Sequence, residues 1–454
     1  MSCKWIDSTL GEYITFKNGK TSPDRDASDP IPVFGSNGII GYSTKNNAPD
    51  NSLIIGRVGS YCGSVYHSPT NCWVTDNAII GLPKHDAESE FWYFLLLTLQ
   101  LNSYRSGSGQ PLINQTTLKS IPIRIPEESS VRSEIGKQLY LFNQKIDFNT
   151  QTNQTLEQIA QAIFKSWFVD FEPVKAKMAV LEAGGTDEQA ELAAMSAISA
   201  KDEAALKQLQ AEHSDAYAEL AQTAALFPSA MEASELGEIP EGWDCKPFGD
   251  LLEKTIGGDW GKEEPDTKHT EKVRILRGTD LPNVHAGNDA SVPLRYVEKK
   301  KLKTRQLQDG DIVIEVSGGS PTQPTGRSIF ISQNVLDRLK KPTEPASFCR
   351  LFRPLDEKTG LLLSVHLTKI YADGKTWLYQ NQSTGISNFQ TKVFLEKEIL
   401  AVPGEKLVNT FYQQVRPLFD RMHSSENQRL INLRDSLLPK LLSGDLPITN
   451  TEVA

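Results

Sequence analysis

The sequence contains few cysteines and no long hydrophobic run, and both absences exclude classes of protein. Its five cysteines include no C-x-x-C pair and are odd in number, so we expect reduced thiols and no metal site. No segment approaches the roughly 18 uninterrupted apolar residues of a membrane helix. The first residues, Met1–Asp7, lack the apolar core of a signal peptide, so we expect a cytoplasmic protein.

Signatures of catalysis are also missing. The chain has no phosphate-binding loop of the G-x-x-x-x-G-K-[ST] type, no Asn-Pro-Pro-aromatic motif of an adenine methyltransferase, no H-E-x-x-H and no nucleophile elbow. The carboxylates of Asp311 and Glu315 are spaced as in some nucleases, but Ser317 stands where a lysine is expected. We therefore predict a chain without catalytic residues or a cofactor of its own. A self-sufficient DNA enzyme is the less favoured alternative.

Acidic residues outnumber basic ones, 57 to 48, which gives a net charge of −9. The excess is unevenly distributed. Residues 170–243 contain 15 Asp and Glu against 4 Lys and Arg, a net of −11, so the remainder of the chain is at about +2. Basic clusters such as Lys299–Arg305 lie in that remainder. The composition therefore leaves room for a basic surface.

The same series of landmarks occurs twice along the chain. In the first copy they are Trp5, Leu10-Gly11, Asp50–Gly56, Ser108-Gly109, Ile125-Pro126 and Asn153-Gln154. In the second copy they are Trp243, Phe248-Gly249, Asp309–Glu315, Thr384-Gly385, Val402-Pro403 and Asn427-Gln428. A period of roughly 240–280 residues is too long for a solenoid. We interpret it as a duplicated half-molecule, in which two equivalent halves perform the same role at two sites.

Each copy begins with a segment of short β-like runs and glycine-rich loops and ends in a long helical pattern. We predict an α+β multidomain fold with an internal pseudo-two-fold repeat, in which two α/β domains are joined by two long antiparallel coiled-coil-like helices. The predicted parts are an α/β domain at 1–126, a helix at 127–172, an Ala-rich acidic helical insertion at 173–235, a second α/β domain at 236–403, a second helix at 404–443 and a tail at 444–454.

Apolar residues recur at steps of three and four along both helical segments, which is the seam of a paired helix. In the first helix the predicted seam is Ile135, Leu139, Phe142, Ile146, Leu156, Ile159 and Ile163. In the second it is Phe411, Val415, Leu418, Met422, Leu430, Leu433 and Leu437. Asn149 and Asn153 interrupt the first seam, and a break near Ser425 interrupts the second, which favours pairing in a fixed register. Pro417 should bend or divide the second helix.

The Ala-rich segment has high helix propensity but a weak apolar seam, so we expect a solvated helical insertion, with a hairpin as its simplest form. It is either a decoration without a direct role or an element that binds a partner or shields charge.

Polar, glycine-spaced loops occur at matching places in both copies. Arg, Asn, Gln and Lys form two-point hydrogen bonds with base edges, while Ser, Thr and backbone amides suit phosphates. The candidate DNA contacts in the first copy are Asn37, Lys45, Asn47, Arg57, Ser106 and Gln110. Those in the second are Trp260, Lys262, Arg277, Thr279, Lys301, Ser317, Ser320, Gln382 and Asn388.

Four motifs together are specific to one family. They are Trp5 with Leu10-Gly11, Leu236–Trp243, Leu156–Phe171 and Leu430–Gly444. In this order the sequence resembles the specificity subunit of a Type I restriction–modification system over nearly the whole chain. The acidic insertion is larger than the linker that the family would lead us to expect.

The resemblance implies a non-catalytic subunit with two target-recognition domains, each reading half of an interrupted DNA sequence, and paired helices that act as a ruler between them. It also implies partners: two modification subunits that bind S-adenosylmethionine and methylate adenine, and two restriction subunits that use ATP and Mg. The alternative is a duplicated coiled-coil scaffold that binds proteins and not DNA.

Overall fold

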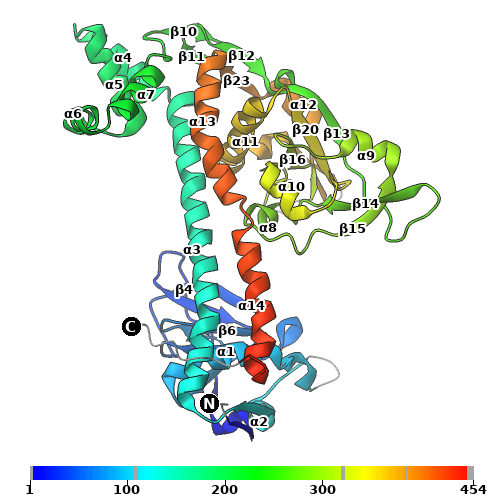
Figure 1. The fold of residues 1–454 in the computed structure, drawn as a ribbon. Coiled ribbons are helices and arrows are strands. Elements are labelled where there is room, and N and C mark those ends of the chain that lie inside the picture. The colour runs from blue at the N-terminus through cyan, green and yellow to red at the C-terminus, as the bar shows by residue number, and fades with distance from the viewer. Residues whose placement is uncertain (1–3, 107–110, 319–322, 384–385, 447–454) are drawn as a thin grey trace. The chain divides into compact units, whose positions relative to one another are not determined.

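The computed structural model of the chain describes residues 4–106, 111–318, 323–383 and 386–446. The chain divides into two compact units, which we describe separately. The first unit comprises residues 1–148 and 429–454, and the second comprises residues 149–428 (Figure 1). None of the helices within the described ranges combines the length and apolar composition needed to span a bilayer.

The first unit contains a four-stranded antiparallel sheet, a three-stranded sheet and a two-stranded ribbon. The strand order of the large sheet is β2 (Ile14–Asn18), β8 (Ala78–Pro83), β5 (Ser52–Gly56) and β6 (Val65–Ser68). The smaller sheet has the order β4 (Gly38–Ser43), β3 (Ile31–Gly35) and β7 (Trp73–Val74), with β3 and β7 parallel. The ribbon pairs β1 (Trp5–Thr9) with β9 (Pro122–Pro126). Helix α1 (Ser89–Thr98) buries its aromatic residues against the large sheet.

The second unit repeats this topology strand for strand. Its large sheet has the order β13 (Leu252–Gly257), β20 (Cys349–Pro354), β16 (Ile312–Glu315) and β18 (Ser328–Phe330). Its smaller sheet has the order β15 (Leu294–Glu298), β14 (His269–Leu276) and β19 (Thr343–Pro345), again with one parallel pair. The ribbon pairs β12 (Asp244–Pro247) with β23 (Ile399–Val402), and α11 (Glu357–Ala372) corresponds to α1. The predicted α+β class and internal repeat are therefore confirmed.

A glycine recurs after the first strand of each domain because another backbone approaches it. A Cβ on Gly11 would lie 2.9 Å from the Cβ of Lys119, in α2 (Gln115–Ser120). A Cβ on Gly249 would lie 3.0 Å from the carbonyl oxygen of Leu395, in α12 (Thr391–Lys397). The repeated Leu-Gly and Phe-Gly landmarks thus record the same close packing, which only glycine permits.

Helix α3 (Ser129–Phe168) packs antiparallel to a partner helix in each unit. In the first unit Asn143 accepts a hydrogen bond of 2.7 Å from Arg434 of α14 (Glu426–Ser443). In the second unit the rings of Phe164 and Phe411 lie 6.2 Å apart, and Phe411 belongs to α13 (Glu405–Met422). The buried amides of Asn149 and Asn427 are joined by a hydrogen bond of 2.9 Å. That bond gives the second unit a fixed register.

The second predicted helix consists of two helices. Pro417 lies inside α13 and does not divide it, whereas the predicted interruption near Ser425 is confirmed, because α13 ends at Met422 and α14 begins at Glu426. Side chains of α10 (Gln333–Leu339) accommodate the end of α13: Asn334 donates to the carbonyl of Asp420 at 2.9 Å and Arg338 to that of His423 at 2.8 Å. Tertiary contacts therefore satisfy carbonyls that the break leaves free.

The seam is partly as predicted. Five of its residues are buried, namely Ile135, Leu139, Phe411, Val415 and Met422. Seven are half-buried, namely Phe142, Ile146, Leu156, Ile163, Leu418, Leu430 and Leu437. Ile159 and Leu433 are 42% and 48% exposed, so their assignment to the seam is wrong. In α3 the buried face passes instead through Ala160, Phe164 and Trp167, because a helix of 3.6 residues per turn drifts from a strict heptad pattern.

The insertion contains four helices and is not a hairpin. They are α4 (Glu172–Glu182), α5 (Asp187–Ser199), α6 (Glu203–Glu212) and α7 (Ser214–Ala224). Ala194, Met195, Leu206 and Ala224 form a small core. Lys177, which is only 1% exposed, donates to the Glu191 carboxylate at 2.6 Å and to the Phe227 carbonyl at 2.8 Å. The insertion is therefore an ordered appendage whose acidic residues point mostly to solvent.

Candidate nucleic-acid interface

The loop that follows β5 in the first unit is held against a second loop near residue 112. The backbone amide of Ile113 donates to the carbonyl of Arg57 at 3.0 Å, and Val58 and Ser106 each form a bridge with Leu112. Arg57 and Ser106, which are 49 positions apart in the sequence, therefore lie on one loop cluster. The Arg57 guanidinium donates a hydrogen bond of 3.4 Å to the carbonyl of Asp76.

The second unit holds the corresponding loops in the same way. The backbone amide of Phe389 donates to the carbonyl of Val316 at 2.9 Å, and Ser317 pairs with Asn388. Ser317 belongs to β17 (Ser317–Gly318), Asn388 to β22 (Ile386–Phe389), and these form a small sheet with β21 (Gln380–Ser383). Asn388 is exposed and Ser317 half-buried. The two domains thus present equivalent loop pairs with different side chains.

Some predicted contacts fall where the structure gives no description. Gln110 and Ser320 lie outside the described residues, as does the side chain of Gln382, whose backbone is part of β21.

The spaced carboxylates of β16 and the residue before it are both held by arginines. Arg353 donates to both oxygens of Asp311, at 2.7 and 2.6 Å, and Arg327 donates to both oxygens of Glu315, at 2.9 and 2.8 Å. Both carboxylates are buried. Their role is therefore to join strands, and among the described residues no group of three His, Cys, Asp or Glu side chains is placed to hold a metal ion.

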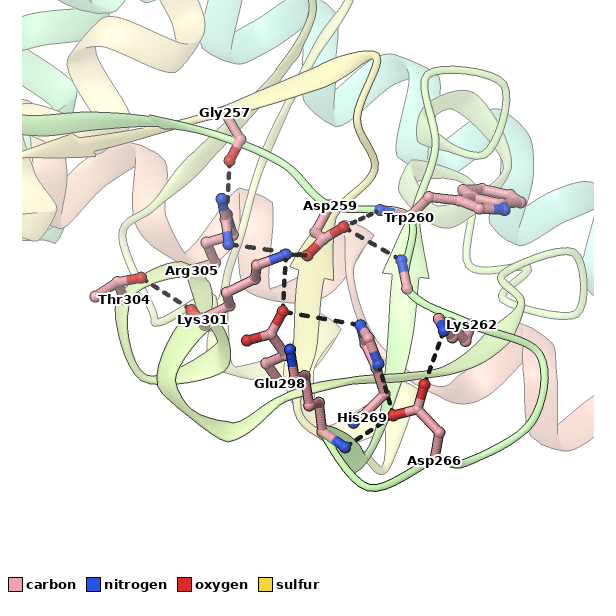
Figure 2. A network of polar contacts seen from close by, with 12 residues as sticks. Gly257, Asp259, Trp260, Lys262, Asp266, His269, Glu298, Lys301, Thr304 and Arg305 are labelled. Atoms are coloured by element: carbon pink, nitrogen blue, oxygen red, sulfur yellow. Dashed lines mark hydrogen bonds and ion pairs between the residues drawn. The ribbon is translucent and has the colours of Figure 1, made fainter.

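Three predicted contacts of the second unit lie in one polar network at the end of β13 (Figure 2). Lys301, in α9 (Lys299–Arg305), donates to Asp259 at 2.9 Å and lies 3.3 Å from Glu298. The other oxygen of Asp259 accepts from the backbone amide of Trp260 at 2.8 Å. Lys262 donates to Asp266 at 2.7 Å. The network joins the loop after β13 to α9, so Trp260, Lys262 and Lys301 belong to one surface.

The charges of this network shift its proton equilibria. Burial raises the pKa of Asp259, but the hydrogen bond and charge of Lys301 outweigh burial and lower it overall. The same contact raises the pKa of Lys301. The charges of this network also act on Glu344, which is fully buried and has no hydrogen-bond partner for either carboxylate oxygen among the described residues. Burial, with the nearby charge of Asp259, raises the pKa of Glu344 to about 7.

Asn47 and Arg277 are used inside their own domains. The Asn47 amide donates to the Val74 carbonyl at 2.9 Å and accepts from the Val74 amide at 2.8 Å. Arg277 donates to both oxygens of the buried Asp280, at 2.8 and 2.7 Å. The prediction that these two residues read bases is corrected, because Asn47 has used both polar atoms and Asp280 occupies the two-point edge of the guanidinium.

Asn37, Lys45 and Thr279 are exposed on loops, but among the described residues no side-chain hydrogen bond joins them to either loop cluster. The sequence reasoning also missed Arg295, whose guanidinium lies 5.0 Å from the centre of the Trp260 ring. Nothing local in the sequence indicates this contact, since it depends on the bridge between Lys262 and Tyr296. Tyr61 and Tyr104, 54% and 38% exposed near the Arg57 loop, were missed as well.

Comparisons with known proteins agree with this geometry. The profile of the Type I restriction modification DNA specificity domain matches residues 3–158. The HindI specificity subunit of Haemophilus influenzae is 32% identical over 396 residues, which cover 82% of this chain and 79% of that one. The MjaIX specificity subunit of Methanocaldococcus jannaschii is 23% identical, over 81% of this chain and 71% of that one.

A solved structure shares the fold. The crystal structure of a Type I restriction–modification S subunit from M. genitalium aligns over 99% of this chain and 97% of that chain, with 16% identity and a TM-score of 0.51. At that identity the likeness concerns the fold alone.

Proposed function

Because the chain belongs to the family of Type I restriction–modification specificity subunits, the non-catalytic DNA-recognition components of those complexes, we propose that its two domains read the two halves of an interrupted DNA target. The observation that supports this most directly is the duplicated topology. Both domains hold an equivalent pair of loops by the same backbone bonds, yet the loops carry different side chains. Different loops on the same scaffold favour two different half-sites, and hence an asymmetric target.

We infer that each recognition domain uses its loop pair in the major groove. In the first domain the contact set is the exposed part of the Arg57 and Ser106 loops, and in the second it is the surface formed by Asn388 and Ser317. The surface around Trp260 and Lys301 adds contacts with the DNA phosphates, since lysine side chains and main-chain amides of a protein suit phosphate oxygens. The proposed limits of the two recognition domains are residues 1–126 and 236–403.

The paired helices are proposed to fix the gap between the half-sites. The proposed helical segments are residues 127–172 and 404–443. Helix α3 has 40 residues, which corresponds to about 60 Å at 1.5 Å per residue. Half-sites one helical turn apart on DNA are separated by ~34 Å. The hydrogen bond between Asn149 and Asn427 supports the proposal, because it gives the second unit a fixed helix register.

We propose that the chain acts in the cytoplasm with two modification subunits and two restriction subunits. The modification subunits would bind S-adenosylmethionine and methylate an adenine in each half-site, after that adenine leaves the base stack. The restriction subunits would use ATP and Mg. Since no catalytic motif was found in the sequence, all of this chemistry belongs to the partners, and the present chain supplies the choice of sequence.

Co-expression with the methyltransferase (modification) subunit of the same system, in a host that lacks other adenine methylation, tests the proposal. Mapping of N6-methyladenine should reveal one interrupted, asymmetric motif methylated on both strands. The methyltransferase expressed alone is the control and should leave the motif unmethylated. A soluble, associated pair that methylates no defined motif would contradict the proposal and favour a protein-binding scaffold.

A further inference from the structure

Helix α9 in the second recognition domain carries its cations on two different faces. Leu302 is buried, in a cluster with Val273, Ile275, Val297 and Ala346. Lys299, Lys300 and Lys303 are exposed, and they form no ion pair within the part of the chain that the structure describes. Positions three and four apart are neighbours on a helix surface, and Lys303 follows Lys300 by three residues and Lys299 by four. The three lysines therefore form a single outward basic face, which we call the α9 face.

The inner side of the same helix is tied to the domain by other charges. Lys301 donates to Asp259 at 2.9 Å, and Arg305 donates to the carbonyl of Gly257 at 2.8 Å (Figure 2). Asp259 in turn accepts from the backbone amide of Trp260. The helix is thus fixed to the end of β13 by its own cations. Because its backbone is already ordered, a ligand that binds the α9 face does not have to order the helix.

The surrounding charges leave this face positive. Residues 259–305 contain 11 Lys and Arg against 8 Asp and Glu, although the whole chain has a net charge of −9. Several of those carboxylates are already neutralised within the domain: Asp259 by Lys301, Asp266 by Lys262 and Asp280 by Arg277. Glu264 and Glu271 of this stretch have no ion pair among the described residues, and neither do the three lysines of the α9 face, which together suit an anionic partner with several charges.

The first recognition domain has a basic residue at the corresponding place. Helix α9 lies between β15 and β16, and the matching connection in the first domain lies between β4 and β5. That connection carries Lys45, which is exposed. Both domains therefore place lysine at the same topological position: one in the first domain, and four in the second, three of which form the α9 face.

We propose that the α9 face binds the phosphate backbone of DNA and fixes the register of the second recognition domain on its half-site. The proposal rests on the DNA recognition proposed above and divides its contacts: the α9 face supplies affinity without sequence information, while the loop pair supplies sequence. Lysine ammonium groups serve this role because they meet phosphate oxygens as point charges from flexible side chains.

Salt dependence measures such contacts. Each phosphate that a protein neutralises on double-stranded DNA contributes about 0.9 to the slope of log K against log salt concentration. Three contacts from the α9 face therefore contribute about 2.7 to that slope. The contribution is the same for target DNA and for unrelated DNA, because phosphates carry no direct sequence information.

The experiment compares the full chain with the triple variant Lys299→Ala/Lys300→Ala/Lys303→Ala. Fluorescence anisotropy measures binding to a duplex with the methylated motif and to a scrambled duplex, at several KCl concentrations. The matched control is Lys175→Ala/Lys201→Ala/Lys392→Ala, which removes three exposed lysines elsewhere and changes the net charge equally. Thermal unfolding of both variants checks that the fold is retained.

We expect the slope of the α9 variant to fall by about 2–3 on both duplexes, while the control keeps the wild-type slope. The methylated motif found in cells should be unchanged. Equal slopes for the α9 variant and the control would overturn the inference. So would a changed motif, which would make the lysines base readers. If the unmodified chain fails to distinguish the target from scrambled DNA, the proposed function itself fails, a result that is separate from the comparison of slopes.

Discussion

Arg132 and Glu88 form a buried ion pair in the first unit, and its removal gives a sharp test of the physical account. Their side chains are 4% and 1% exposed. Arg132 donates to both carboxylate oxygens, at 2.9 and 2.7 Å, and to the carbonyls of Pro126 and Glu127. Glu88 also accepts from Ser129 and, at 3.0 Å, from Trp92. The pair therefore joins the start of α3 to α1.

The change Arg132→Met removes the cation but keeps an apolar side chain of similar length. It leaves a carboxylate buried without its ionic partner, which costs about 3–5 kcal/mol in unfolding free energy. Arg124→Met is the matched control, because Arg124 is exposed in the same unit. A surface change of that kind should stay within about 0.5 kcal/mol. Adding Glu88→Gln to Arg132→Met should recover part of the loss, since it removes the unpaired charge.

The pH dependence supplies a second, independent signature. In the wild type, burial raises the pKa of Glu88, but Arg132 and Ser129 outweigh burial and lower it below 4.5, so its contribution to stability is present above pH 4.5 and lost on acidification. Without Arg132, burial should raise the pKa above 4.5, so the variant should lose stability as pH rises. The gap in the free energy of unfolding between the wild type and Arg132→Met should widen from pH 4 to pH 7, by about 1.4 kcal/mol for each unit by which the pKa of Glu88 is raised.

Urea unfolding at pH 4, 5, 6 and 7 measures this gap, and hydrogen exchange of the α1 amides assigns it to the first unit. A loss below 1 kcal/mol at pH 7, or a gap that stays constant across the pH series, would refute the reasoning.

Three further predictions follow from the second unit, the loops and the helices. Burial raises the pKa of Glu344 from 4.5 to about 7, so the native state loses stability as pH rises through this window. Glu344→Gln should therefore raise the free energy of unfolding by about 2–3 kcal/mol at pH 8 and change it little at pH 4. Urea unfolding at the two pH values measures this difference. Arg57→Ala should reduce discrimination against wrong bases in one half-site by about 1–3 kcal/mol, as measured by DNA binding. An equal loss of affinity for all DNA sequences would show instead that Arg57 contacts a phosphate. Four residues inserted after Phe148 and four before Arg429 should lengthen the helix pair by ~6 Å and widen the methylated motif's gap without changing its half-sites.

The duplicated landmarks already determined the broad architecture of the protein. Trp5 and Trp243, with the glycines that follow them, mark equivalent positions because the same close packing recurs in both domains. Apolar periodicity found the long helices for the same kind of reason: burial repeats at each turn, and the pattern is local. The resemblance to the specificity subunits, which these motifs indicated, is confirmed by the comparisons.

Tertiary structure alone decided which polar side chains are available for DNA. Asn47 and Arg277 have the right chemistry for base edges, but Val74, far away in the sequence, occupies the amide of Asn47, and Asp280 occupies the guanidinium of Arg277. Asp280 is close in the sequence, but its burial, which only the fold sets, makes Arg277 its ionic partner. The exposed Ile159 shows the same limit in a helix, since its neighbours across the fold determine which face is buried. The number of helices in the insertion also escaped sequence reasoning, because its four core residues, two of them alanines, come from three short helices and give no strong apolar period. A sequence thus records local conformation and repeated packing, whereas the burial of a polar group, and with it the group's availability for DNA, depends on the segments that the fold packs around it.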